Sequence, residues 1–244
     1  MLNRFDVRKG VVLVGSSSDI GREILKNLNP APNANLLCLG RRHYSYPDIE
    51  WPYGKMKKIE IELESSESLN DVIFQIESLP EFDLVILAAG YLPNELQDEN
   101  LVEVRRALRI NGESIILLLS AFAKRLSHLG GGKVLLISSV AATRPRIRNF
   151  TYGASKSAAD FFAIGLASRY RSTGVDIKII RPGFVFTKMT TDFKPAPFAI
   201  TVEEVSRLAI KTLRGKRNVT YAPQFLKLVM NILRILPRRI FNRL

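Results

Sequence analysis

Four polar residues in the middle of the chain have the types and the spacing that reduction of a carbonyl group requires. Tyr152 and Lys156 are four residues apart, so a helix would place both side chains on one face. Ser139 follows an apolar run, and Asn111 lies farther upstream. Carbonyl reduction puts negative charge on the oxygen and needs an acid that supplies a proton. We therefore expect Asn111, Ser139, Tyr152 and Lys156 to form a catalytic group.

Each of the four residues has an expected role. A free tyrosine has a pKa of about 10, and a neighbouring ammonium favours the tyrosinate. We expect Lys156 to lower the pKa of Tyr152, which donates the proton, while Ser139 binds the carbonyl oxygen. Asn111 is expected to hold a water molecule that relays protons to Lys156. Each residue alone also fits packing, solvation or a helix kink, so the combination carries the prediction.

Short apolar runs alternate with helical stretches, which is the pattern of βαβ units wound into one parallel sheet with helices on both faces. The predicted strands are 11–14, 36–39, 58–63, 84–87, 133–138, 176–180 and 219–221. The predicted helices are 20–28, 66–78, 101–111 running on to 126, 154–171 and 202–213. The sequence thus predicts one doubly wound α/β domain of the Rossmann type over residues 1–223, followed by a tail over 224–244.

The turn after the first predicted strand has the composition of a dinucleotide-binding turn. Such a turn aims backbone N–H groups and a helix N-terminus at a pyrophosphate. An ordinary strand-to-helix turn also carries a glycine, so this signal is weak on its own. The expected cofactor contacts in the turn are Gly15, Ser17, Ser18, Asp19, Ile20 and Gly21.

The end of the second predicted strand bears on the choice between the two nicotinamide cofactors. An acidic residue there binds the ribose 2′-hydroxyl of NADH, whereas arginine fits the 2′-phosphate of NADPH. The chain has Arg41 and Arg42 and no acid, which favours NADPH; the alternative is that both arginines stack on adenine or face solvent. Glu62 is expected to reach the adenine or to be a solvated charge. Ala89 and Gly90 are small enough for the dinucleotide to lie against the backbone.

The composition excludes several other classes of protein. The 244 residues are 46% hydrophobic, which fits a globular domain rather than a disordered chain. Cys38 is the single cysteine and there are two histidines, so we expect neither a disulfide framework nor a metal site. Apolar runs fall short of the ~20 residues of a membrane span, and the first residues lack the apolar stretch of a secretory signal. A cytoplasmic location is therefore expected.

Positive charge is concentrated in the second half of the chain. The net charge is +13, and no Asp or Glu follows Glu204, which predicts an anionic partner met by one face. Just before Tyr152, three arginines alternate in a segment expected to be extended. Arg144, Arg146 and Arg148 are predicted to hold a phosphate or phosphodiester of the substrate. The alternative is a solvated basic loop.

The tail has the pattern of an interfacial helix. Residues 225–236 are apolar except for Lys227, Asn231 and Arg234, which cluster on one side of a helix. This pattern is typical of a helix lying in an anionic membrane surface, here the inner face of the cell membrane. The alternative is a helix docked on the domain or on a second subunit. Nucleic-acid binding fits poorly, because a face that tracks phosphates would not need so many aliphatic residues.

Several further motifs accompany the catalytic group. They are the turn Gly15–Gly21, Ala88-Ala89-Gly90, Ser138-Ser139, Tyr152-Gly153-Ala154-Ser155-Lys156, and Arg181-Pro182-Gly183 with Thr187. With Asn111 they resemble the short-chain dehydrogenase/reductase family over almost the whole chain. The resemblance implies that the four residues named first are catalytic and that Pro182, Gly183, Val185 and Thr187 lie along the nicotinamide. It also implies a homo-oligomer. Asp19 departs from the family, where glycine is commoner.

A more specific pattern lies toward the C-terminus. The segments Arg181–Thr190, Lys194–Pro197, Tyr221–Pro223 and Leu236–Phe241 are similar to one subgroup of the family, the reductase half of decaprenylphosphoryl-ribose 2′-epimerases. This resemblance implies reduction of the 2-keto group of a polyprenylphosphoryl pentofuranose to the arabinose epimer used for cell-wall arabinan. It implies a flavin-dependent oxidase subunit as partner. It also implies NADH, against the NADPH that Arg41 and Arg42 favour, so the expected cofactor is NAD(P)H.

Two other functions stay open. A short-chain reductase or dehydrogenase of another lipid-soluble ketone or alcohol would share the catalytic group, but a neutral lipid gives no reason for three arginines beside it. A non-catalytic scaffold that binds the dinucleotide would be a protein of another class. Degenerate relatives of that kind usually lack the tyrosine or the lysine, and this chain retains Tyr152 and Lys156.

Overall fold

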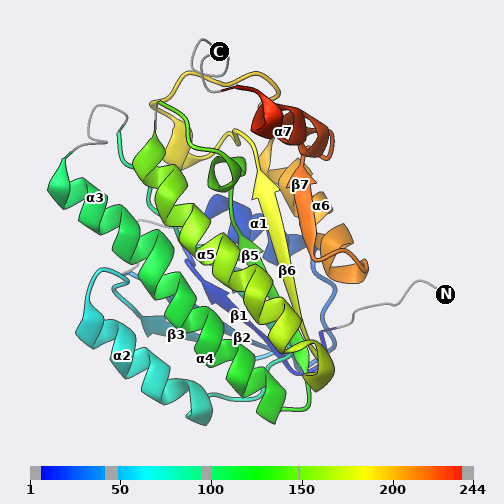
Figure 1. Ribbon diagram of the computed structural model, residues 1–244. Helices are drawn as coiled ribbons and strands as arrows, with labels where there is room; N and C mark the ends of the chain where they lie inside the picture. Colours follow the sequence, from blue (N-terminus) through cyan, green and yellow to red (C-terminus); the bar gives the residue numbers. More distant parts are fainter. Residues whose placement is uncertain (1–6, 42–48, 95–99, 148, 238–244) are drawn as a thin grey trace.

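The computed structural model describes residues 7–41, 49–94, 100–147 and 149–237, and these build one parallel sheet between two layers of helices (Figure 1). The seven strands lie in the order β3-β2-β1-β4-β5-β6-β7, and every neighbouring pair is parallel. The strands are β1 (Gly10–Val14), β2 (Asn35–Gly40), β3 (Met56–Glu60), β4 (Leu84–Leu87), β5 (Gly132–Ile137), β6 (Val175–Pro182) and β7 (Val219–Ala222). The predicted doubly wound α/β fold is confirmed.

The central strands are apolar along their whole length because helices cover both faces of the sheet. Every residue of β1 and β4 is buried. The edge strand β3 is mostly exposed and carries charges, as edge strands often do. It spans Met56–Glu60 rather than the predicted 58–63, because its partner β2 ends at Gly40, which pairs with Glu60. One more backbone bond follows the strand, from the Ile61 N–H to the Gly40 carbonyl at 3.1 Å.

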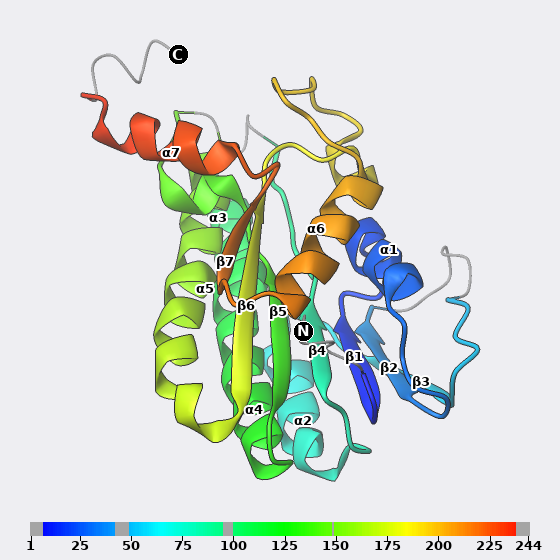
Figure 2. The same cartoon turned by 90° about the vertical axis from the view of Figure 1, so that its right-hand side faces the viewer.

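Helices α2 (Ser66–Gln75), α4 (Ser114–His128) and α5 (Phe150–Arg169) cover one face of the sheet. Helices α1 (Asp19–Asn27) and α6 (Val202–Arg214) cover the other face (Figure 2). Each layer has its own buried core, with Phe82 and Phe122 packed edge to face on the first side and Ile24 and Leu213 on the second. Because all neighbouring strands are parallel, their C-terminal ends lie along one edge of the sheet, called the upper edge here, where the loops that follow the strands meet.

The predicted helix from 101 to 126 is interrupted at its candidate catalytic residue. Helix α3 (Leu101–Ala107) passes through a π-helical segment (Leu108–Glu113) into α4, and Asn111 lies within that segment. A π-helical segment shifts the helix by one residue and is frequent at functional sites. Asn111 is fully buried there.

Helix α7 (Leu226–Ile235) lies across the upper edge of the sheet rather than against either face (Figure 2). Leu226 and Met230 are buried against Val140 and Tyr221. One side of the predicted tail helix is thus docked on the domain, which was the alternative to a membrane surface. In the part of the chain with described structure, no helix is both long and apolar enough to cross a membrane.

Candidate active site

Three of the four predicted catalytic residues line one cavity of about 1260 Å³ at the upper edge of the sheet. Ser139 follows β5, while Tyr152 and Lys156 lie one turn apart in α5. The helix begins at Phe150, earlier than the predicted 154, after Asn149 adopts a left-handed conformation with φ 54°. Asparagine tolerates this conformation better than most residues. The early start puts Tyr152 in the first turn of α5, near Ser139.

Asn111 lies beside this cavity rather than on its lining. Its amide Nδ2 donates to the carbonyl oxygen of Tyr91 at 2.7 Å and to Ser155 Oγ at 3.0 Å. Its Oδ1 accepts the Tyr91 backbone N–H at 2.8 Å. Asn111 therefore ties the loop after β4 to α5. Its expected role in holding a relay water stays a prediction.

Gly90 separates Asn111 from Lys156 and leaves room between them. A Cβ at Gly90 would lie 3.1 Å from Lys156 Nζ and 3.3 Å from Asn111 Oδ1. Any larger residue would push on the ammonium group. Gly90, which is expected beside the dinucleotide, therefore also leaves room for the Lys156 ammonium and the Asn111 amide to approach the same part of the loop after β4.

The pKa of Tyr152 differs from the expectation. Burial raises it from 10.0 to about 12, although a hydrogen bond from the Ser139 hydroxyl acts in the opposite direction. Lys156 does not reverse this, because its Nζ lies 5.9 Å from the centre of the Tyr152 ring and donates to the Ile137 carbonyl at 3.2 Å. The expected lowering of the tyrosine pKa by lysine is thus wrong for this structure. Burial outweighs the hydrogen bond with Ser139.

Burial acts on the lysine as well. It lowers the pKa of Lys156 from 10.5 to about 8, and the carboxylate of Asp160 opposes that change. A protonated tyrosine and a lysine that titrates near pH 8 suit reduction, in which Tyr152 gives up a proton and needs it replaced. The structure therefore favours Tyr152 as an acid and Lys156 as the group that restores its proton.

A buried polar network that the sequence did not predict lies behind Lys156. Asp160, one turn along α5, accepts hydrogen bonds from Ser138 Oγ at 2.5 Å and from Arg181 Nε at 3.0 Å. A second nitrogen of Arg181 binds the other carboxylate oxygen, and Nη1 donates to the Tyr221 hydroxyl at 2.8 Å. The available signal was an acid four residues after Lys156 in an otherwise apolar helix face.

A second part of the cavity has the shape of a dinucleotide cradle. Gly15 has φ +87°, and a Cβ there would lie 2.5 Å from the Ala89 backbone nitrogen. Ser18 caps helix α1 by accepting the Gly21 N–H at 3.2 Å, which leaves its own proton free to donate. The Asp19 carboxylate accepts the Lys188 N–H at 2.9 Å from across the cavity. Asp19 thereby joins the first turn to the loop after β6.

Most of the predicted cofactor contacts lie on this part of the cavity. The lining includes Gly15, Ser17, Ser18, Asp19, Ile20, Arg41, Glu62, Ala89, Gly90, Tyr152, Lys156, Pro182, Gly183, Val185 and Thr187. Gly21 is buried just below, where a Cβ would meet Leu13 Cδ1 at 2.9 Å and Ala88 Cβ at 3.0 Å. Arg42 lies outside the described residues. A helix N-terminus, a glycine cradle and small residues at the end of β4 fit a nicotinamide dinucleotide.

The remaining wall of the cavity is apolar and comes largely from α7. Residues of this wall include Phe184, Phe198, Leu226, Val229, Met230 and Leu233. Gly183 lets the helix approach closely, since a Cβ there would lie 2.8 Å from Leu226 Cδ1. The sequence predicted residues 224–244 to be a tail that lies on a membrane surface or docks on the protein. In the structure α7 docks beside the catalytic residues and lines the same cavity.

The three predicted substrate arginines have different surroundings. Arg146 lines the cavity. Arg144 donates from Nη2 to the Leu236 carbonyl at 2.9 Å and so binds the end of α7, where helix carbonyls lack partners. Arg148 lies outside the described residues. Of the described pair, only Arg146 stands where a substrate phosphate could reach it.

The comparisons with known proteins agree with this geometry. A family model described as short chain dehydrogenase matches residues 9–197. The chain therefore belongs to the short chain dehydrogenase family.

Curated relatives include two bacterial proteins and one mammalian enzyme. An uncharacterized oxidoreductase of Streptomyces coelicolor is 29% identical over 244 residues, covering 97% of this chain and 96% of the relative. An uncharacterized oxidoreductase of Mycobacterium tuberculosis is 38% identical over 127 residues, or 52% of this chain, and the match spans about half (51%) of that relative. The very-long-chain 3-oxoacyl-CoA reductase of Rattus norvegicus is 28% identical over 231 residues, covering 95% of this chain and 69% of the enzyme.

Solved structures share the fold. A short chain dehydrogenase from Burkholderia cenocepacia in complex with NADP superimposes with a TM-score of 0.75 at 20% identity, over 94% of this chain and 99% of that one. A short-chain dehydrogenase from Sphingobium yanoikuyae in complex with NADPH gives a TM-score of 0.75 at 17% identity, over 94% and 97%.

Proposed function

We propose that this oxidoreductase reduces the 2-keto group of a polyprenylphosphoryl pentofuranose with NAD(P)H. One observation carries the proposal: a single cavity joins Tyr152, Lys156 and Ser139 to Arg146 and to the apolar wall of α7. A keto sugar on a lipid phosphate has three parts of matching chemistry, namely a carbonyl, an anion and a long apolar chain. The arginine suits the phosphodiester, and the apolar wall suits the first prenyl units.

The residues of the cavity divide the work of the reduction. When bound, the nicotinamide supplies the hydride. Ser139 donates a hydrogen bond to the substrate carbonyl oxygen, where negative charge develops. Tyr152 gives its phenolic proton to that oxygen, and Lys156 returns a proton to Tyr152. The carboxylate of Asp160, which Arg181 holds in place, keeps Lys156 protonated to higher pH.

The position of Arg41 bears on the cofactor. Arg41 follows the last residue of β2, is exposed and lines the dinucleotide end of the cavity. A guanidinium there suits the 2′-phosphate of NADPH. The structural neighbours from Burkholderia cenocepacia and Sphingobium yanoikuyae hold NADP and NADPH. The resemblance to the epimerase subgroup favours NADH, so assays with both cofactors decide the choice.

The proposed reaction needs a partner enzyme. A 2-keto sugar lipid must be formed by oxidation of the corresponding 2-hydroxy sugar lipid, and a flavin-dependent oxidase subunit would supply it. Reduction at the opposite face of the ring then completes an epimerisation to the arabinose sugar of cell-wall arabinan.

A second candidate is reduction of a long-chain ketone, such as a 3-oxoacyl compound, in place of a polyprenyl-phosphate sugar. The rat very-long-chain 3-oxoacyl-CoA reductase, similar over 95% of this chain, favours it. The apolar wall of α7 suits either lipid. The keto-sugar lipid carries a phosphodiester that Arg146 can bind. An uncharged long-chain ketone offers Arg146 no such group, so the two substrates should respond differently to loss of this arginine.

The test compares one variant on two substrates. Arg146→Ala should lower kcat/KM for the polyprenylphosphoryl 2-keto pentofuranose by about tenfold to a hundredfold, because a charge-assisted hydrogen bond is lost. Turnover of an uncharged long-chain ketone should stay unchanged. Arg171→Ala, which removes an exposed arginine in the short 3-10 helix after α5, serves as the matched control. No turnover of the keto-sugar lipid by the wild type, with rapid turnover of the ketone, would overturn the first candidate.

A further inference from the structure

Helix α7 presents two apolar faces, and only one of them is used by the fold. The inner face carries Leu226 and Met230, which are buried, and Val229 and Leu233, which are half-buried. These four residues line the cavity. Together with the hydrogen bond from Arg144 to the Leu236 carbonyl, they dock the helix on the domain.

The outer face is a second stripe at helical spacing. Phe225, Leu228, Ile232 and Ile235 follow one another at intervals of three or four residues and so lie along one side of the helix. Their exposed fractions are 46%, 66%, 53% and 84%. Monomeric soluble proteins rarely expose a contiguous apolar surface of this kind without a use for it.

The outer stripe continues around the mouth of the cavity. Phe198, in the loop after β6, packs edge to face on Phe225 with ring centres 4.9 Å apart. Phe186 and Met189 in the same loop and Ile147 before α5 are exposed as well. Figures 1 and 2 both show this loop and α7 at the edge where the strands end. We call these eight residues the apolar rim: Ile147, Phe186, Met189, Phe198, Phe225, Leu228, Ile232 and Ile235.

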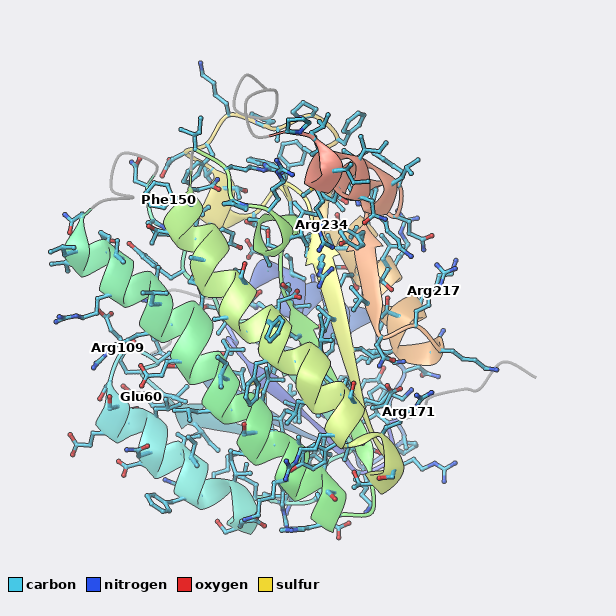
Figure 3. All side chains as sticks on the ribbon, viewed as in Figure 1. Glu60, Arg109, Phe150, Arg171, Arg217 and Arg234 are labelled. Atoms are coloured by element: carbon cyan, nitrogen blue, oxygen red, sulfur yellow. The ribbon has the colours of Figure 1, made fainter. Side chains whose placement is uncertain are left out.

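The charged side chains around the apolar rim are mostly positive. On α7, Lys227 and Arg234 are exposed and lie on one flank of the outer stripe (Arg234 is labelled in Figure 3). No acid occurs in residues 140–155 or after Glu204, and the loop 183–201 contains only Asp192. A second copy of the chain seated here would bring like charges together, which opposes a symmetric contact. An anionic lipid surface complements both the apolar stripe and the cations.

We propose that the apolar rim seats on an anionic lipid surface, with the mouth of the cavity facing the lipid. Leu228, Ile232 and Ile235 enter the boundary between headgroups and acyl chains, while Lys227 and Arg234 contact the anionic headgroups. A lipid-borne substrate then passes from the membrane to Tyr152 along the inner face of α7. The seating on lipid does not depend on which ketone the enzyme reduces, whereas the path of a lipid-borne substrate rests on the proposed function.

The test is sedimentation of the full-length protein with vesicles. Anionic vesicles contain phosphatidylglycerol and phosphatidylcholine, and neutral vesicles contain phosphatidylcholine alone. The wild type should sediment with anionic vesicles and about tenfold less with neutral ones, since surface charge and apolar burial act together. The variant Leu228→Ser/Ile232→Ser/Ile235→Ser should lose about tenfold or more of the partitioning to anionic vesicles. Phe74→Ser on α2, which removes a side chain that is 82% exposed, should bind as the wild type does.

Two further measurements keep the result unambiguous. Binding of the dinucleotide by the triple variant, followed by nicotinamide fluorescence, should match that of the wild type and shows that the fold is intact. Equal binding of triple variant and wild type to anionic vesicles would overturn the proposal, as would no binding by the wild type. A triple variant that keeps its vesicle binding but changes from dimer to monomer would assign the stripe to a second copy instead.

Discussion

Asp160 and Arg181 form a buried ion pair directly behind the candidate catalytic lysine. Two nitrogens of the guanidinium bind the two carboxylate oxygens, and the side chains are only 5% and 12% exposed. Asp160 lies one turn from Lys156 in α5, whereas Arg181 comes from β6 and also binds the Tyr221 hydroxyl. Tyr221 belongs to β7 and packs in one buried cluster with Leu226 and Met230 of α7. The pair therefore connects the lysine to the helix that forms the substrate wall.

The variant Asp160→Asn tests whether this pair tunes Lys156. The Asp160 carboxylate opposes the lowering of the Lys156 pKa by burial, so its removal should lower that pKa further below about 8. Deprotonation of Lys156 should make kcat/KM decline at alkaline pH, and in this variant the decline should begin at a lower pH than in the wild type. Breaking a buried pair also costs roughly 3–5 kcal/mol of stability, so the profile is measured below the unfolding temperature of the variant.

The matching variant Arg181→Gln separates tuning from simple damage. It removes the cation that faces Asp160, so the negative charge acts more strongly on Lys156 and the fall should move to higher pH. Similar loss of activity in both variants with an unmoved pH profile would show that the pair is structural only.

The rate of reduction by the wild-type enzyme should depend on pH through one descending limb, at alkaline pH. Tyr152, with a pKa of about 12, stays protonated through the physiological range, while Lys156 is charged below about pH 8 and neutral above it. Reduction should therefore be constant on the acid side and decline as pH rises through about 8. A rate of reduction that rises between pH 7 and pH 9 would contradict these protonation states.

The central strands, and the helix face that Tyr152 and Lys156 share, could be predicted from the sequence for a clear physical reason. Strands β1 and β4 are covered on both faces, so they are apolar throughout and stand out from the surrounding helices. Tyr152 and Lys156 share a face because a helix brings every fourth residue together. How deeply a side chain is buried cannot be predicted in this way, because burial depends on elements that are far apart in the chain. The raised pKa of Tyr152 follows from burial, so the sequence did not predict it.

The cofactor choice can be tested at the end of β2. Arg41→Asp replaces the guanidinium by a carboxylate that repels a 2′-phosphate and binds a 2′-hydroxyl. The KM for NADPH should rise by about tenfold or more, and that for NADH should fall or stay level. KM values for both cofactors in the wild type and the variant give the answer. An unchanged ratio would mean that Arg41 does not contact the adenosine ribose.

The cradle can be tested with two glycines in different surroundings. Gly15→Ala places a Cβ 2.5 Å from the Ala89 nitrogen at φ +87°, which costs about 1–2 kcal/mol in backbone strain alone. Cofactor affinity and melting temperature should both fall. Gly165→Ala in α5 meets no described atom within 4 Å and should raise stability by about 0.5–1 kcal/mol. Thermal unfolding with and without NADPH measures both effects.

The part played by α7 could not be read from its sequence, because both of its faces are apolar. Leu226 and Met230 face the domain, whereas Leu228 and Ile235 face outward, and only the packing against Val140 and Tyr221 distinguishes them. Arg144 is a similar case. Its spacing with Arg146 suggested a shared phosphate site, but the fold turns its guanidinium to the Leu236 carbonyl.

The most direct measurement is a single-turnover reduction of the keto substrate by Tyr152→Phe, followed by nicotinamide absorbance. Removing the phenolic hydroxyl leaves the ring and the cavity wall in place, so the dinucleotide should bind with wild-type affinity. The rate of reduction should fall by about 10²–10⁴-fold because the proton donor is gone. Reduction by Tyr152→Phe at the wild-type rate would contradict the assignment of Tyr152 as the acid.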